Sequence, residues 1–171
     1  MRVETKVLLQ HLWMWPFSMM YWGLYLAPLM MLKFIQWESD REGVHIFRVN
    51  AALSTWRMQR WLHNVYLWYI ARWKDWGASA GPYCITLSPT QKLTERTWLH
   101  EKSHCDDCLK YGWLMPFMYF FHSAWLWLFC KDKHSYLDNF SERKARAAAG
   151  QKVDFTKEEW PHGEDDRWAW W

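Results

Sequence analysis

The segment from Val7 to Leu32 carries no charged side chain and is bracketed by Lys6 and Lys33. Its apolar residues are spread over all faces of a helix, and about 20 apolar residues are enough to cross a bilayer. Pro16 and Pro28 would kink such a helix, so a buried core helix or a pair of short helices is the alternative. On its length, we expect the segment to form a hydrophobic, membrane-associated helix.

Tryptophan is several-fold more frequent than in ordinary proteins, with 17 Trp in 171 residues and 20% aromatic side chains overall. This content excludes a disordered chain, and 7 Gly and 6 Pro are too few for a collagen-like or linker sequence. Trp13, Trp15, Trp22 and Trp37 lie where an interfacial aromatic belt would place them. The tryptophans favour a chain seated against a membrane, or one with an unusually aromatic core.

Charge and cysteine content exclude two further classes of protein. The chain has 21 basic and 18 acidic residues, a net charge of +3 and no basic run interleaved with aromatic residues, so we expect no nucleic-acid partner. Four cysteines are too few for a disulfide scaffold at this length, although their number allows disulfides.

Two short strands and a helix are predicted in the first half of the chain. After the polar stretch 38–43, residues 44–49 are typical of a strand, and residues 83–87 are typical of a second one. Residues 51–73 between them favour a helix, which the glycines and proline of 76–82 end.

The next helix is predicted from its terminal signals. Ser88 suits an N-cap, Pro89 suits the first helical position, and Gln91 would complete a capping box. We expect this helix to end at Tyr111, before Gly112.

A second charge-free run, from Tyr111 to Cys130, follows this helix. It suits a membrane span, a re-entrant segment or a core helix. Because it contains Pro116, His122 and Ser123, we expect that it does not span fully.

A short alanine-rich helix is predicted over residues 141–149, closed by Gly150. The chain is thus expected to be mainly α-helical with a small β element. We expect three parts: a hydrophobic N-terminal segment (1–37), a central domain (38–150) and a charged tail ending in tryptophans (151–171).

The predicted helix from Ser88 contains an H-E-x-x-H motif, His100-Glu101-Lys102-Ser103-His104. Residues four apart share a helix face, so both imidazoles can reach one zinc ion. Glu101, beside the first ligand, can take a proton from zinc-activated water. The motif predicts metal-dependent hydrolysis; the alternative is two histidines on a solvent-facing helix.

A catalytic zinc requires a third protein ligand. A metzincin would have Gly at 107 and a ligand at 110, where this chain has Asp107 and Lys110. A downstream helix offers Glu142, and Ala145 on the same face would let that helix approach the motif closely. We predict Glu142 as the third ligand, with Asp107 and His134 as the alternatives.

The run from Ile85 to Ala149 resembles a group of small bacterial zinc-metallopeptidase-like proteins of the gluzincin type. Their pattern combines a hydrophobic N-terminal segment, a short strand, H-E-x-x-H, a Gly eight residues after the second His, an apolar stretch and Tyr-x-x-Asn-Pro-Phe-Glu. The chain matches this pattern at His100, Glu101, His104, Gly112, Tyr136, Asn139 and Glu142. It departs from the pattern at Lys102, Asp107 and the pair Phe140-Ser141.

This resemblance implies a zinc ion held by His100, His104 and Glu142, with Glu101 as the base. It also implies that the motif helix packs on the helix that carries Glu142, behind a hydrophobic N-terminal helix. The expected activity is zinc-dependent hydrolysis of a peptide or protein substrate. The expected location is a membrane, the bacterial inner membrane rather than the soluble cytoplasm.

A hydrolase of this kind needs a second group that stabilises the developing oxyanion. Tyr136 and His134 both lie near the third ligand in the sequence, and either is a candidate. We place Tyr136 in this role.

The cysteines offer a rival zinc site. The spacings Cys105-x2-Cys108 and Cys130-x3-His134 suit a structural tetrahedral zinc. The residues between the two pairs are almost wholly apolar, unlike a zinc-finger loop. The alternative function is therefore a non-catalytic membrane-associated protein, with this structural zinc or with no metal.

Overall fold

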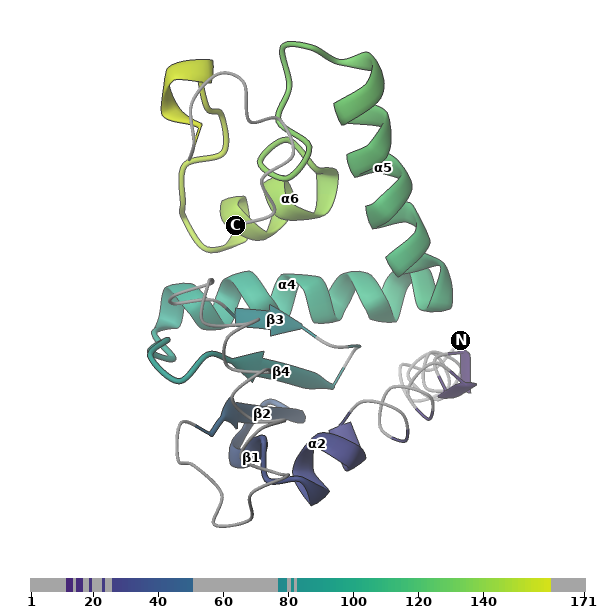
Figure 1. Ribbon diagram of the computed structural model, residues 1–171, viewed down its shortest axis with the longest axis vertical. Helices are drawn as coiled ribbons and strands as arrows, with labels where there is room; N and C mark the ends of the chain where they lie inside the picture. Colours follow the sequence, from purple (N-terminus) through teal and green to yellow (C-terminus); the bar gives the residue numbers. More distant parts are fainter. Residues whose placement is uncertain are drawn as a thin grey trace, which may run out of the picture.

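Helix α4 (Glu95–Tyr111) is the central layer of the molecule, with a small β-sheet on one side and α6 (Phe140–Ala148) on the other (Figure 1). The computed structural model describes residues 12, 13, 15, 16, 19, 23, 26–50, 77–79, 81 and 83–160. The expected combination of helices with a small sheet is confirmed, although the sheet exceeds the two strands predicted. The predicted helix over 51–73 and the end of the tail, 161–171, lie outside the described residues.

Four strands form the sheet, in the spatial order β1-β2-β4-β3. They are β1 (Ile35–Arg41), β2 (Val44–Val49), β3 (Gly77–Ser79) and β4 (Cys84–Leu87). β2 and β4 confirm the two predicted strands and pair in parallel, whereas β1 and β3 pair antiparallel with them at the two edges. The edge nearest α4 is thus β3, a strand that the sequence patterns do not predict (Figure 1).

A tight hairpin joins β1 to β2. Its turn residues, Glu42 and Gly43, have φ angles of 50° and 78°, the left-handed pair that suits a two-residue hairpin. The stretch 38–43, interpreted from the sequence as a polar connection, is therefore mostly strand. Its polar side chains fit because β1 is an edge strand whose residues beyond Ile35 are largely exposed.

α4 begins later than its sequence signals predict. Its N-cap is Thr94, whose hydroxyl accepts a hydrogen bond from the Thr97 N–H at 3.2 Å. Ser88, the predicted N-cap, instead accepts from the Gln91 N–H in a turn, and Arg48 of β2 donates to the Gln91 carbonyl at 2.7 Å. The predicted start is wrong because this contact with β2 holds the apparent cap in a separate turn.

The end of α4 at Tyr111 is confirmed, since Gly112 follows it with a φ of 64° that favours glycine. On the sheet side of α4, Trp98 is buried against side chains of β2 and β4. On the opposite side α4 packs against α6, and near its C-terminal end Cys108 packs with Met115 of the next helix. Packing on two sides fixes the directions in which the side chains of the H-E-x-x-H motif point.

The second charge-free run forms a short 3₁₀ helix, η2 (Gly112–Leu114), and then α5 (Met115–Phe129). Pro116 lies in the first turn of α5, where no N–H partner is needed, so it starts the helix rather than interrupting it. Within the described residues, no helix combines the length and the apolar character needed to cross a membrane. Of the N-terminal run, α2 (Ala27–Met31) and a few single residues are described, and the rest lies outside the described part.

α6 confirms the predicted short helix. Asn139 caps it by accepting from the Ser141 N–H at 3.0 Å, and Gly150 follows its end with a φ of 62°. The Asn139 amide also donates to the Ser123 hydroxyl on α5 at 2.7 Å. These bonds join α5 to the first turn of α6, which carries Glu142.

Candidate metal centre

Three of the predicted site residues meet between α4 and α6. His100 and His104 lie one turn apart on α4, and Glu142 lies in the first turn of α6. Their ligand atoms all lie within 4.8 Å of one another, so the group could hold a metal ion. No second group of this kind occurs in the part of the chain that the structure describes.

The spacing of these atoms suits a shared cation better than direct hydrogen bonds. Nε2 of His100 lies 3.4 Å from one oxygen of Glu142, and Nε2 of His104 lies 3.4 Å from the other. A charge-assisted hydrogen bond would be shorter, at about 2.7 to 2.9 Å. Ligand atoms about 2.0 to 2.2 Å from a tetrahedral zinc ion stand about 3.3 to 3.5 Å apart.

A chain of hydrogen bonds orients the ring of His104. Its Nδ1 lies 2.9 Å from the Ser141 hydroxyl, which donates to Asp107 at 3.0 Å. Because a carboxylate only accepts, the Ser141 proton is committed to Asp107, and the hydroxyl oxygen accepts from Nδ1–H of His104. Lys144 forms an ion pair with Asp107. Burial lowers the pKa of His104, so the neutral ring directs the Nε2 lone pair at Glu142.

The side chain of Gln151 orients the ring of His100. Its side-chain oxygen lies 3.2 Å from Nδ1 of His100, which makes Nδ1 the donor and leaves Nε2 facing Glu142. Burial acts to lower the pKa of His100, but the contact with Glu142 and the charges of Glu101 and Glu142 outweigh it and raise that pKa. The raised pKa shows that this position favours a positive charge beside Glu142.

Glu142 is a buried, charged carboxylate. Burial acts to raise its pKa, but the contact with His100, the charges of both histidines and the hydrogen bond from Tyr119 lower it to about 2. The Tyr119 hydroxyl, on α5, donates to Oε1 at 2.9 Å, whereas Oε2 has no hydrogen-bond partner. An orphaned oxygen on a buried carboxylate is unfavourable unless a cation compensates it. The donor set therefore fits a metal: two imidazole nitrogens and one carboxylate.

Glu101 lies beside this group, between α4 and the edge strand β3. The Ser79 N–H donates to its carboxylate, and a Cβ at Gly77 would lie 2.8 Å from its Oε1. Burial raises the pKa of Glu101 to about 7, opposed by His100 and assisted by the charge of Glu142. Its Oε2 has no hydrogen-bond partner. A carboxyl group with a pKa near neutrality can both accept and donate a proton.

Tyr136 also reaches the third ligand. Burial, together with the charge of the nearby Glu142, raises the pKa of the phenol well above its usual value. The Arg146 guanidinium lies 5.7 Å from the centre of its ring. The phenol stays protonated at neutral pH and keeps a donor for hydrogen bonding.

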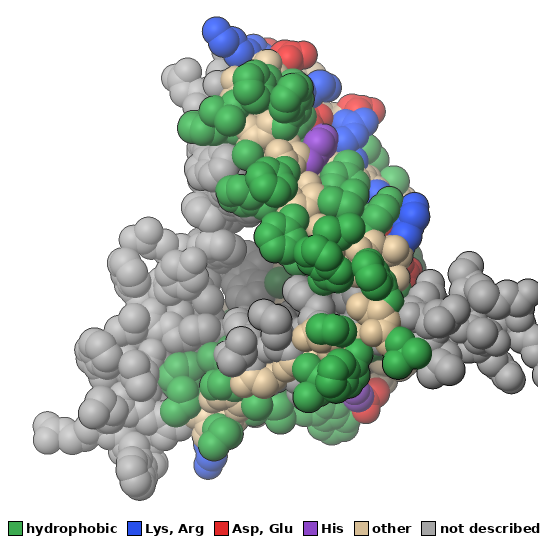
Figure 2. Space-filling view, turned by 90° about the vertical axis from the view of Figure 1, so that its right-hand side faces the viewer, with side chains coloured by type: hydrophobic (Ala, Val, Ile, Leu, Met, Phe, Trp, Pro, Cys, Tyr) green, Lys and Arg blue, Asp and Glu red, His purple; other side chains and the backbone are tan. Residues whose placement is uncertain are grey.

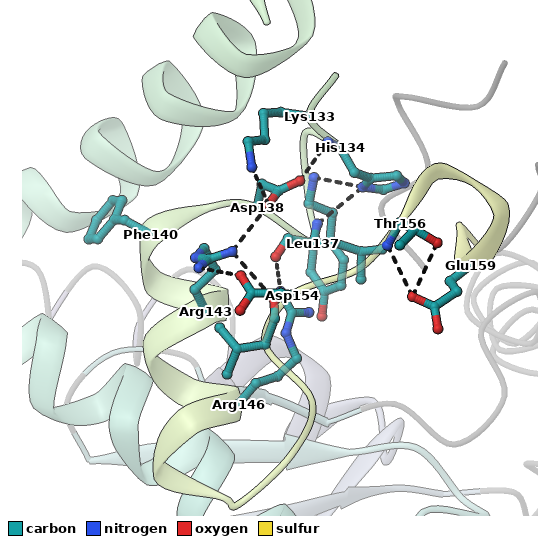
Figure 3. Close-up of polar contacts among 12 residues, drawn as sticks. Lys133, His134, Leu137, Asp138, Phe140, Arg143, Arg146, Asp154, Thr156 and Glu159 are labelled. Atoms are coloured by element: carbon teal, nitrogen blue, oxygen red, sulfur yellow. Dashed lines mark hydrogen bonds and ion pairs between the residues drawn. The ribbon is translucent and has the colours of Figure 1, made fainter. Parts of the chain in front are cut away.

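The loop that leads into α6 is fixed by side chains of α6 (Figure 3). Arg146 donates to the Leu137 carbonyl, and Arg143 donates to Asp138 at 3.3 Å and to Asp154 at 2.7 Å. These bonds hold the loop and the segment after α6 to the same helix. The first turn of α6, and with it Glu142, is therefore held in a rigid frame.

His134 is part of this frame rather than of the centre. Its Nδ1 accepts from the Leu137 N–H at 3.1 Å (Figure 3) and from the Tyr136 N–H at 3.1 Å. Its ring meets the Trp160 ring edge to face, with 5.4 Å between the ring centres. As an alternative ligand or electrophile, His134 is not brought to the other site residues. These hydrogen bonds to the buried His134 ring fix the turn in which Tyr136 lies.

The remaining alternative ligands also lie outside the group. Asp107 accepts a hydrogen bond from Ser141 and forms an ion pair with Lys144, so it supports His104 through Ser141 instead of joining the group. All four cysteines are free thiols, and burial raises the pKa of Cys108 to about 12 and that of Cys105 well above its usual value. Among the described residues, the rival Cys/His site is not assembled.

Tyr119, Ser141 and Gln151 touch the candidate ligands and are absent from the sequence prediction. For Ser141 the sequence offers one signal, because this position departs from the pattern of the resembled proteins, as does its hydrogen-bond partner Asp107. The departure at Lys102 has a different explanation, because this residue forms an ion pair with Asp106 on the exposed side of α4.

Fold and site together define a protein of helices and a small sheet with a candidate His-His-Glu metal centre. Comparison with protein-family models, curated proteins and solved structures gives no match to this chain. The resemblance to gluzincin-type proteins therefore stays a prediction.

Proposed function

We propose that this chain is a zinc-dependent hydrolase that cleaves peptide bonds, with a gluzincin-like centre formed by His100, His104 and Glu142. The observation that supports it most is the convergence of two Nε2 atoms, each opposite a bonded Nδ1, on a carboxylate with an orphaned oxygen. Two histidines and one glutamate are a recurring ligand set of catalytic zinc, which leaves one position open. Zinc, without a geometric preference of its own, suits this mixed nitrogen and oxygen set.

The neighbouring residues supply the proton chemistry. When bound, zinc supplies a Lewis acid that polarises a carbonyl group and makes water more acidic. Glu101, with an unpartnered Oε2 and a pKa of about 7, takes the proton from the attacking water and passes it to the leaving amine. Tyr136 donates a hydrogen bond to the developing oxyanion.

The edge strand favours a peptide as the substrate. Among the described strands, β3 pairs with β4 alone, with Ala78 opposite Thr86. An extended peptide can add to such an edge through main-chain hydrogen bonds. The bond between Ser79 and Glu101 brings this edge to the base, so a peptide added there would pass beside Glu101.

Metal analysis of variants is the direct test. We expect one zinc ion per wild-type chain after purification in zinc-containing buffer, loss of that zinc in His100→Ala and Glu142→Ala, and hydrolysis of an unstructured protein such as casein by the wild type. Cys105→Ala is the control, because Cys105 lies on the same helix and belongs to the rival site. A wild type without zinc would contradict the proposal, and so would zinc lost in Cys105→Ala but kept in His100→Ala.

A further inference from the structure

α5 exposes large apolar side chains to solvent along its whole length. Phe117, Phe121, Trp125 and Leu128 are 54%, 65%, 57% and 56% exposed and are spaced by four, four and three residues, so they form one stripe of the helix. Figure 2, which faces this side of the molecule, shows hydrophobic side chains along α5. A monomeric soluble protein rarely leaves such a continuous surface uncovered, so this face indicates an interaction site.

The polar side chains of α5 all turn the other way. Tyr119 donates to Glu142, Ser123 accepts from Asn139, and Nδ1 of His122 accepts from the Phe140 N–H at 3.2 Å. These three residues are bonded to α6 or to its cap, opposite the stripe of Phe117 and its neighbours. The backbone of α5 is satisfied within the helix, so its outer face can enter an apolar medium without leaving a polar group unpaired.

A second exposed apolar segment is continuous with this face. Leu12, Trp13 and Trp15 are 60%, 47% and 61% exposed, and a side chain at Gly112 would collide with the Trp13 indole. Trp13 therefore lies beside the first residue of η2. Segments that are far apart in the sequence thus contribute tryptophan and other apolar side chains to one side of the molecule.

Exposed lysines border both apolar segments. Lys33 follows the N-terminal segment, Lys110 precedes η2, and Lys131 follows α5. None of the three forms an ion pair with a carboxylate among the described residues. Lysines around an apolar and tryptophan-rich face match the anionic headgroups and acyl chains of a lipid surface.

The length of α5 indicates how this helix would lie against a bilayer. Its 15 residues extend about 22 Å, whereas the hydrocarbon core of a bilayer is about 30 Å thick. We propose that α5 lies in the plane of an anionic lipid surface, with the stripe from Phe117 to Leu128 in the boundary between headgroups and acyl chains. A second protein is a poorer match, because protein interfaces carry regular hydrogen bonds and this stripe has no polar side-chain group other than an indole N–H.

Vesicle binding of the full chain tests this docking surface. We expect the wild type to co-sediment with vesicles of equal parts phosphatidylcholine and phosphatidylglycerol, and more weakly with phosphatidylcholine alone. The double variant Phe117→Glu/Phe121→Glu should lower the partition coefficient about tenfold or more. Ala147→Glu/Ala148→Glu, which adds the same two negative charges at exposed positions of α6, should leave it within about twofold.

Circular dichroism and zinc titration establish that each variant is folded. If the double variant does not fold, Phe121→Ser alone should lower the partition coefficient by a smaller factor. The proposal is overturned if the wild type stays in solution or if the double variant partitions like the wild type. It is also overturned if the double variant only converts a dimer into a monomer, since the face would then bind a second copy of this chain. Partitioning is measured without hydrolysis, so it is independent of the proposed activity.

Discussion

Nδ1 of His104 and the hydroxyl of Ser141 lie 2.9 Å apart, and this bond links α4 to the residue directly before Glu142 on α6. A candidate ligand on one helix is thus oriented by the neighbour of a candidate ligand on the other. The Ser141 hydroxyl in turn donates to Asp107, which is only 1% exposed. The ring orientation of His104 therefore depends on the packing of the two helices.

Replacing Ser141 by alanine should weaken zinc binding without unfolding the protein. The His104 ring loses its acceptor, and loss of such an outer contact raises the Kd of a metal site about tenfold to a hundredfold. Competition with a chelating dye measures this Kd. Ser135→Ala is the matched control, since Ser135 is also buried but its hydroxyl has no hydrogen-bond partner. Equal zinc affinities of Ser141→Ala and the wild type would contradict the prediction.

Glu101→Gln should keep zinc and lose hydrolysis. The amide preserves the shape of the side chain but cannot accept the proton of water, and loss of a general base lowers kcat by about a hundredfold or more. Zinc content and peptide turnover, measured on the same sample, separate the two properties. Glu95→Gln, an exposed change on the same helix, should leave both unchanged. Unchanged turnover in Glu101→Gln would show that Glu101 is not the base.

Glu101 should also make the metal-free protein less stable as the pH rises. Burial raises its pKa from 4.5 to about 7, so between these values the folded chain holds a proton that the unfolded chain has released. The free energy of unfolding then decreases with pH. The contribution is complete below pH 4.5 and is lost as the pH rises through about 7. Urea unfolding in the presence of EDTA should show Glu101→Gln gaining stability relative to the wild type over this window; a difference that does not change with pH would contradict the prediction.

Tyr136 and Tyr119 both lie near Glu142, but removing their hydroxyls should give different phenotypes, because only the Tyr119 hydroxyl is placed to donate to Glu142. Tyr136→Phe should lower kcat about tenfold to a hundredfold and leave the zinc Kd unchanged, because its phenol is assigned to the oxyanion. Tyr119→Phe should raise the zinc Kd and leave the kcat of the zinc-loaded enzyme nearly unchanged. Steady-state kinetics at saturating zinc and a zinc titration distinguish them. The reverse pattern would exchange the roles of the two tyrosines.

The convergence of His100, His104 and Glu142 could be predicted from the sequence because its signals are local. His100 and His104 are one helical turn apart, and the alanines and the closing glycine at position 150 mark the helix that carries Glu142. The spacing within α4 fixes two ligands on one face, and the alanines of α6 allow the close approach of the third.

Other features depend on contacts between residues that are distant in the sequence. β3 consists of Gly77, Ala78 and Ser79, which have low strand propensity, and it is a strand because β4 and α4 lie beside it. The start of α4 was misplaced because Arg48, from another strand, holds the turn after Ser88. Such contacts have no signature in the local pattern.

α5 has two sides with different neighbours. Tyr119 on its inner side touches Glu142, while Phe121 on its outer side faces the proposed lipid surface. A helix with its side chains is about 10 Å across, so the depth of one helix separates the candidate metal from the headgroups. A polypeptide segment that emerges from the bilayer beside α5 would come within reach of the centre after only a few extended residues.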